Sequence, residues 1–204
     1  MAGGRVEVET SAGAGDVQLD GGDGARFLVV LTHGAGGSTE AADLLAVRDA
    51  CVELGGLVAR VTQPYRVRGA RAPGNAVRQD EAWTEIVTAL RAAFPDGPLV
   101  QGGRSNGARV ACRTAVAVGA AGVMALAYPL HPPGKPASSR AGELREPREA
   151  GIPVLVINGE RDPFGVPDAA DADRIVVVPG ETHALRGHRA VIKAAVAGWL
   201  PTVT

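Results

Sequence analysis

The sequence predicts an α/β protein built on a mostly parallel sheet with helices on both faces. Six segments rich in Val, Leu, Ile and Ala recur along the chain, near 27–32, 57–62, 98–102, 123–127, 153–158 and 174–178. Strands that crossover helices bury on both faces have continuous apolar runs of this kind. Longer helical patterns lie between these runs, and the alternation of strand and helix is typical of a parallel sheet.

Two further strands are expected before these six. Residues 5–9 and 16–19 alternate polar and apolar side chains around Gly13-Ala14-Gly15, which indicates a hairpin at the edge of the sheet. The prediction is therefore eight strands in a single domain, with residues 1–26 as the N-terminal edge hairpin. Helices are expected near 38–54, 75–94, 105–118 and 184–199. Trp83 lies on the apolar face of the second helix, so we expect it in the core.

Length and composition limit the classes of protein that fit. The 204 residues are 46% hydrophobic, which is enough for one domain with a sizeable core. A net charge of −1 gives no reason to expect nucleic acid or an anionic membrane as a partner. No apolar run approaches a membrane span, and the first residues do not resemble a signal peptide. Cys51 and Cys112 are too few for a disulfide framework, so we expect reduced thiols in a cytoplasmic protein.

The strand expected at 98–102 leads into Gly103-Arg104-Ser105-Asn106-Gly107, a Gly-x-Ser-x-Gly pattern. This pattern is typical of a nucleophile elbow, a sharp strand-to-helix turn that exposes a serine hydroxyl above the sheet. The N-terminus of the following helix favours negative charge that develops there. In a chain with 28 glycines the pattern alone is a weak signal, and serine is also a common helix cap. The rest of the chain must supply a base.

An acid and a histidine follow in the required order. Asp162 comes after the strand at 153–158, and His183 comes after the strand at 174–178. Serine, acid and histidine is the chain order of an α/β-hydrolase triad, and ligands of open α/β sheets bind at the carboxyl ends of strands. We therefore predict Ser105 as the nucleophile, His183 as its base and Asp162 as the acid that orients the base.

Both partners of the serine have competitors. Glu160 lies closer to the strand end than Asp162 does, and Asp168 could cap a short helix. Asp162 is preferred because it lies at the loop turn past the strand. His188 falls within the last helical pattern, whereas His183 lies in the strand-to-helix loop where a base is needed.

The segment His33-Gly34-Ala35-Gly36-Gly37, after the strand at 27–32, is a candidate oxyanion loop. A tetrahedral intermediate needs two N–H donors, one from the residue after the nucleophile and one from this loop. We predict the Asn106 amide as the first donor and the Ala35 amide as the second, with Gly36 as the alternative.

Other polar residues are candidates for substrate contact, namely His33, Arg66, Arg104 and His131. The two histidines suggest a metal site, but no third ligand has a fitting spacing, so no metal is predicted. We expect His33 to order the oxyanion loop and His131 to line the site. The arginines near the loop ends form a wider group, Arg66, Arg68, Arg71 and Arg104. Such a run is usually a solvated loop, and the alternative is that some of these arginines bind a carboxylate or phosphate of the substrate.

Residues 129–150 lie where larger α/β-hydrolases often carry a helical cap. Only about twenty residues are available, which is too few for a lid domain on ordinary loop statistics. The sequence therefore predicts an open, shallow site without a cap.

Four segments resemble a small, cap-less α/β-hydrolase family related to dienelactone hydrolases, namely 32–37, 102–109, 128–136 and 159–165. The most specific is Pro129-Leu-His-Pro-Pro-Gly134. The resemblance extends from about residue 27 to the C-terminus. Eukaryotic relatives of this family include the testis-expressed protein thirty and a regulatory subunit of the NSL histone acetyltransferase complex. The resemblance implies a hydrolase fold with Ser105, Asp162 and His183 as the triad.

These features predict a serine hydrolase that cleaves an ester or thioester of a small molecule through an acyl-enzyme, without a cofactor. The same site could transfer the acyl group to a nucleophile other than water. The alternative from another class is a non-catalytic interaction module, because a fold does not fix a function. The sequence leaves the natural substrate and the oligomeric state open.

Overall fold

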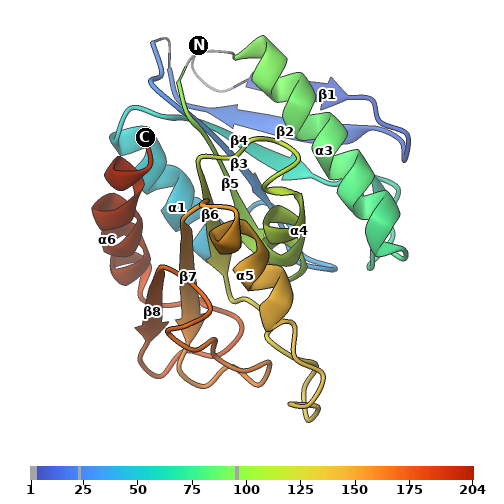
Figure 1. The fold of residues 1–204 in the computed structure, drawn as a ribbon. Helices are drawn as coiled ribbons and strands as arrows, with labels where there is room; N and C mark the ends of the chain where they lie inside the picture. Colours follow the sequence, from blue (N-terminus) through green and yellow to red (C-terminus); the bar gives the residue numbers. More distant parts are fainter. Residues whose placement is uncertain (1–3, 23, 95–96) are drawn as a thin grey trace.

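The computed structural model describes residues 4–22, 24–94 and 97–204, and a single eight-stranded sheet runs through them (Figure 1). The strands are β1 (Gly4–Val8), β2 (Gly15–Asp20), β3 (Leu28–Thr32), β4 (Leu57–Thr62), β5 (Leu99–Arg104), β6 (Gly122–Leu126), β7 (Val154–Gly159) and β8 (Arg174–Val178). Their order is β1-β2-β4-β3-β5-β6-β7-β8. The pairs β1–β2 and β2–β4 are antiparallel, and every other pair is parallel.

This arrangement confirms the predicted mostly parallel sheet of eight strands with an antiparallel N-terminal hairpin. Residues 1–3 and 23 of the predicted hairpin segment lie outside the described residues. Strands β3 and β7 are buried along their whole length, as their apolar sequences indicate.

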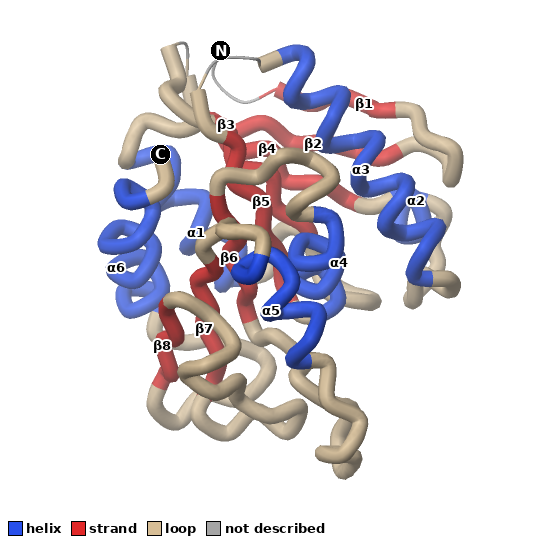
Figure 2. The backbone as a smooth tube through the Cα atoms, viewed as in Figure 1, coloured by secondary structure: helices blue, strands red, loops and turns tan. Residues whose placement is uncertain are grey.

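The helices of the described residues are α1 (Ala42–Glu53), α2 (Pro64–Val67), α3 (Ala76–Ala93), α4 (Asn106–Thr114), α5 (Ala141–Glu149) and α6 (Arg189–Trp199). Helices α1 and α6 pack together on one face of the sheet, and α3, α4 and α5 cover the other (Figure 2). No helix in this part of the chain is both long and apolar enough to span a membrane.

Four helices were predicted, and their bounds differ from the structure where the chain turns. Helix α4 ends at Thr114, four residues earlier than predicted. Helix α6 begins only at Arg189, because Leu185 and His188 have positive φ angles of 42° and 55° that no α-helix accommodates. The sequence did not predict α2 or α5. Helix α5 was not predicted because it is short and contains Pro147, and proline is a poor helix former.

A buried polar contact anchors β5, the strand that carries the elbow. Trp83 of α3 is fully buried, which confirms the core position predicted for it. Its indole N–H donates to Gln101 Oε1 of β5 at 2.8 Å, and Gln101 Nε2 donates to the Ala111 carbonyl of α4 at 2.6 Å. Burying the side-chain amide of Gln101 costs little free energy while it is hydrogen-bonded, but much more if its partners move away. These hydrogen bonds therefore fix how α3 and α4 lie on the sheet.

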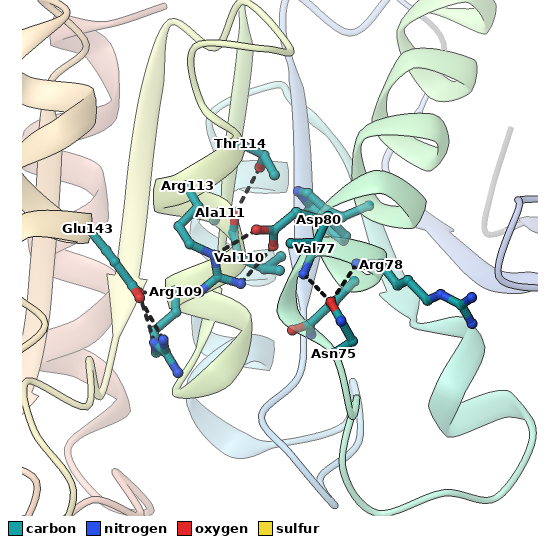
Figure 3. Close-up of polar contacts among 12 residues, drawn as sticks. Asn75, Val77, Arg78, Asp80, Arg109, Val110, Ala111, Arg113, Thr114 and Glu143 are labelled. Carbon is teal, nitrogen blue, oxygen red and sulfur yellow. Dashed lines mark hydrogen bonds and ion pairs between the residues drawn. The ribbon is translucent and has the colours of Figure 1, made fainter.

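The outer surfaces of α3, α4 and α5 are joined by ion pairs (Figure 3). Arg113 binds Asp80 through two hydrogen bonds of 2.7 Å. Arg109 binds Glu143 in the same forked manner, at 2.8 and 2.6 Å, and Arg113 also reaches Glu143 at 3.2 Å. Burial raises the pKa of Glu143, but the two arginines outweigh this effect and hold it below its usual value. Glu143 therefore ties α5 to α4.

The two cysteines are free thiols in the core, as predicted. Cys51 lies in α1 and Cys112 in α4, and both are almost fully buried. Burial raises the pKa of Cys51 to about 12, and it raises that of Cys112 as well. Neither thiol has the thiolate character that a reactive cysteine needs.

Candidate active site

The turn between β5 and α4 holds Ser105 in a strained conformation. Its φ of 53° and ψ of −112° lie outside the regions that serine ordinarily adopts. The glycines on either side explain how the chain accepts this turn. A Cβ atom on Gly103 would lie 2.8 Å from the Thr32 carbonyl oxygen, and one on Gly107 would lie 2.7 Å from that of His33. Both distances are too short, so each outer position of the Gly-x-Ser-x-Gly pattern requires glycine.

The side chain of Ser105 faces His183 and does not cap the following helix. Ser105 Oγ lies 2.9 Å from His183 Nε2, and no side-chain capping bond to α4 is present. On the other side of the ring, His183 Nδ1 lies 2.8 Å from Asp162 Oδ2. The structure thus brings together the three residues predicted as nucleophile, base and acid.

The carboxylate of Asp162 fixes the orientation of His183. Its side chain has no exposed surface, and its second oxygen, Oδ1, accepts the Phe164 N–H at 2.9 Å. A carboxylate accepts hydrogen bonds, so Nδ1 of His183 carries the proton and Nε2 is left to face Ser105. The ring of Phe164 packs on the imidazole with a centroid separation of 4.2 Å.

The loops that carry Asp162 and His183 pass very close to each other. A Cβ atom on Gly159, the last residue of β7, would lie 2.5 Å from the carbonyl oxygens of Glu181 and Thr182. Glycine at this position therefore lets the loop after β8 cross the end of β7. The acid and the histidine meet because of that crossing, although 21 positions separate them in the chain.

The competing residues have other partners. Glu160 is exposed, and its Oε2 accepts the Gly180 N–H at 2.8 Å. The Asp168 N–H donates to Asp171 within the turn that precedes β8. His188 Nδ1 lies 3.1 Å from Glu181 Oε1, and half of the His188 side chain is exposed.

The predicted oxyanion loop is a tight turn beside Ser105. The Gly37 N–H donates to the Gly34 carbonyl at 2.9 Å, and Gly36 has a φ of +67° that suits glycine. A Cβ atom on Gly34 would lie 3.1 Å from that of Ser105, so the turn packs against the serine. Ala35 and Asn106 line the same cavity as Ser105. Within the described part of the chain, neither of their amides donates a hydrogen bond.

His33 lies beneath this turn and not in the cavity. It is fully buried, its Nε2 accepts the Gln63 N–H at 3.1 Å, and its Nδ1 lies 2.9 Å from the Gly34 carbonyl oxygen. Burial lowers the pKa of His33, so the ring is neutral and Nδ1 is the nitrogen that donates to Gly34. A substrate has no access to either nitrogen. His33 orders the turn, as expected, and it is not the substrate contact that the sequence also suggested.

His131 does not line the cavity either. Its Nδ1 lies 2.9 Å from the Pro132 carbonyl oxygen, and its ring packs against Gly165. Of the predicted arginines, only Arg104 reaches the cavity. Arg66 Nε donates to the Gly37 carbonyl at 3.1 Å and so supports the oxyanion turn from outside. The side chain of Arg68 donates to the Ala12 carbonyl.

Arg104 joins the histidine loop to a buried carboxylate that sequence reasoning missed. Its Nε donates to Asp43 Oδ2 at 2.8 Å, and its Nη2 donates to the His183 carbonyl at 2.7 Å. Burial raises the pKa of Asp43, and the charge of Arg104 counteracts that effect. A charged residue within the apolar pattern of α1 was the available signal, since a buried charge is almost always paired.

We expect Arg104→Met to destabilise the fold by about 3 kcal/mol, because it leaves the Asp43 carboxylate buried without its cation. Chemical denaturation would measure the loss. The double variant Asp43→Leu/Arg104→Met is the control, since replacing both partners by apolar residues is often close to neutral. An Arg104→Met protein as stable as the wild type would show that the pair contributes nothing.

The cavity above Ser105 has a volume of about 330 Å³. Its walls come from the oxyanion turn, the elbow, α4, the segment before α5 and the two loops that carry Phe164 and His183. Pro129 and Arg140 are in this lining, so the short segment predicted to be too small for a lid forms one wall. A larger cavity of about 800 Å³ lies between the β1–β2 turn, α2 and α3, away from Ser105.

Comparison with known proteins agrees with this geometry. A protein family described as an alpha/beta hydrolase domain matches residues 25–183. An α/β serine hydrolase homologue from Coxiella burnetii aligns with a TM-score of 0.78 at 17% identity, over 97% of each chain. A serine hydrolase without a lid from Xanthomonas campestris aligns with a TM-score of 0.76 at 20% identity, over 98% of this chain and 96% of that one.

The dienelactone hydrolase of Anabaena variabilis has a similar fold, with a TM-score of 0.74 at 18% identity over 98% of this chain and 97% of that chain. A comparison with curated proteins found no match to this chain. At these identities the structural likeness shows the fold, and it agrees with the dienelactone-hydrolase resemblance seen in the sequence.

Proposed function

Because this chain belongs to the α/β-hydrolase family, we propose that it is a serine hydrolase that cleaves an ester or thioester of a small molecule. The observation that carries the proposal is the hydrogen-bonded series of Ser105, His183 and Asp162 beside a cavity. The strained backbone of Ser105 adds support, since such strain concentrates at functional sites.

In the proposed mechanism, Ser105 Oγ attacks the substrate carbonyl carbon while His183 Nε2 takes the hydroxyl proton. The N–H groups of Ala35 and Asn106 stabilise the oxyanion of the tetrahedral intermediate. When the C–O or C–S bond breaks, His183 returns the proton to the leaving alcohol or thiol. Water, activated by the same histidine, then hydrolyses the acyl-enzyme and restores Ser105.

The names of the structural neighbours support hydrolysis as the reaction class, since they include serine hydrolases and an esterase from Pyrobaculum calidifontis. Acyl transfer to another nucleophile would use the same residues. The kinship with the eukaryotic regulatory proteins stays a prediction of the sequence, as does a cytoplasmic location. A regulatory module without activity would gain nothing from a strained serine aligned with a base.

The small cavity leads us to expect a preference for short acyl chains. Its volume of about 330 Å³ is near the lower end for small-molecule sites. On p-nitrophenyl esters, kcat/KM should fall by about tenfold or more between butyrate and decanoate, because a longer chain has no wall to bury it. Labelling with a fluorophosphonate tests the proposal independently of the substrate. Absence of both labelling and esterase activity would favour the interaction module.

A further inference from the structure

Three arginines from different elements line the cavity above Ser105. Arg104 ends β5, Arg109 lies one turn into α4, and Arg140 precedes α5. No aspartate or glutamate is among the described residues that line this cavity. The distribution of nearby carboxylates therefore decides whether the cavity attracts an anion.

Two of these arginines are paired with carboxylates that lie outside the cavity lining. Arg104 is paired with Asp43 at 2.8 Å. Arg109 is paired with Glu143 through two hydrogen bonds, and Figure 3 shows this carboxylate on the side of Arg109 that faces α5. Glu143 also binds Arg113, so one carboxylate is shared between two guanidinium groups. Arg113 is in turn paired with Asp80, so these two arginines are matched by two carboxylates.

Arg140 has no such partner. Among the residues that the structure describes, no carboxylate lies within salt-bridge distance of its guanidinium, and its Nη1 donates to the Pro129 carbonyl at 3.1 Å. Burial lowers the pKa of Arg140 and the charge of Arg109 lowers it further, while the more distant charge of Glu143 acts in the opposite direction.

The backbone of Arg140 is held firmly. Its N–H donates to the Leu130 carbonyl at 2.7 Å, and its own carbonyl accepts the hydroxyl of Tyr128 at 2.8 Å. Tyr128 is fully buried. The guanidinium is therefore carried by an ordered segment, and less entropy is lost when it binds a ligand than for an arginine on a solvated loop.

We propose that Arg140, with Arg109 beside it, forms an anion subsite, and that the substrate is a small ester or thioester bearing an anionic oxygen group. The guanidinium fork matches both carboxylate and phosphate. This inference rests on the proposed hydrolase function for the identity of the reacting bond. The sequence suggested that other arginines, among them Arg66 and Arg104, bind an anion. The proposal assigns that role to Arg109 and Arg140 instead.

The kinetic test compares mono-p-nitrophenyl glutarate with the neutral p-nitrophenyl valerate, which has an acyl chain of the same length. We expect the wild type to prefer the anionic ester by about tenfold or more in kcat/KM, and Arg140→Gln to remove that preference. Arg140→Lys should retain part of it. Arg71→Gln is the matched control, since Arg71 is exposed and outside the cavity lining. An equal ratio in wild type and Arg140→Gln would overturn the subsite.

A binding test separates failure of the subsite from failure of the hydrolase proposal. The Ser105→Ala protein, with and without Arg140→Gln, would be titrated with monoethyl glutarate, ethyl valerate and inorganic phosphate, observed by ligand NMR. Binding of glutarate ester or phosphate that weakens by about tenfold in Arg140→Gln supports the subsite, even if the wild type hydrolyses no ester. Which of the two binds more tightly distinguishes a carboxylate from a phosphate substrate. Binding of neither anion, or binding unaffected by Arg140→Gln, overturns the subsite and leaves the hydrolase proposal to its own tests.

Discussion

Replacement of Ser105 by alanine is expected to lower kcat by on the order of 10⁴-fold or more, because the variant has no group to form the acyl-enzyme. The fold should keep its stability, since Ser105 Oγ makes no capping bond to α4 and, among the described residues, hydrogen-bonds to His183 alone. Hydrolysis of p-nitrophenyl butyrate would measure the rate, and thermal unfolding would measure the stability.

Ser138→Ala is a suitable control for this experiment, because Ser138 is exposed and lies outside the cavity lining. It should retain full activity and full labelling by a fluorophosphonate. A Ser105→Ala enzyme that kept a tenth of the wild-type rate, or that was still labelled, would refute the assignment of the nucleophile.

His183→Ala should cause a loss of similar size, whereas His188→Asn should keep most of the activity. His183 Nε2 is the base within 2.9 Å of Ser105 Oγ, and His188 is paired with Glu181 at the start of α6. Asparagine is chosen for position 188 because it tolerates the positive φ found there. Steady-state kinetics of the two variants would test the assignment.

The double variant Ser105→Ala/His183→Ala adds an internal check. Residues that act as one unit lose activity non-additively, so the double variant should be no slower than either single variant within about a factor of ten. Loss of activity in His188→Asn with retention in His183→Ala would show that the base is a different histidine.

Much of the fold could be predicted because its signals are local. The apolar strand sequences are typical of a buried parallel sheet, and all eight predicted strands are present in the structure, each within a few residues of its predicted bounds. The elbow also has a local signal, because Gly103, Ser105 and Gly107 stand within five residues, although the carbonyl oxygens that require these glycines belong to Thr32 and His33. The local sequence did not predict α5, because this helix is short and contains Pro147. Its contacts with α4 stabilise it.

The candidate site was only partly determined by the sequence. The order of serine, acid and histidine limited the choice to a few residues, but Asp162 and Glu160 are too close in the chain for spacing to separate them. The structure distinguishes them because the loop after β8 crosses Gly159 and places His183 against Asp162 alone of the two.

The arginines depended still more on tertiary structure. Arg66 and Arg68 bind backbone carbonyls elsewhere, while Arg109 and Arg140 line the cavity. A sequence determines which residues carry charge and which strands are buried, because those properties follow from each side chain and its near neighbours. It does not show which carboxylate neutralises which arginine, since such pairs join residues that are distant in the chain. In this protein that pairing leaves Arg140, among the described residues, without a carboxylate in salt-bridge distance, although it lines the cavity beside the serine.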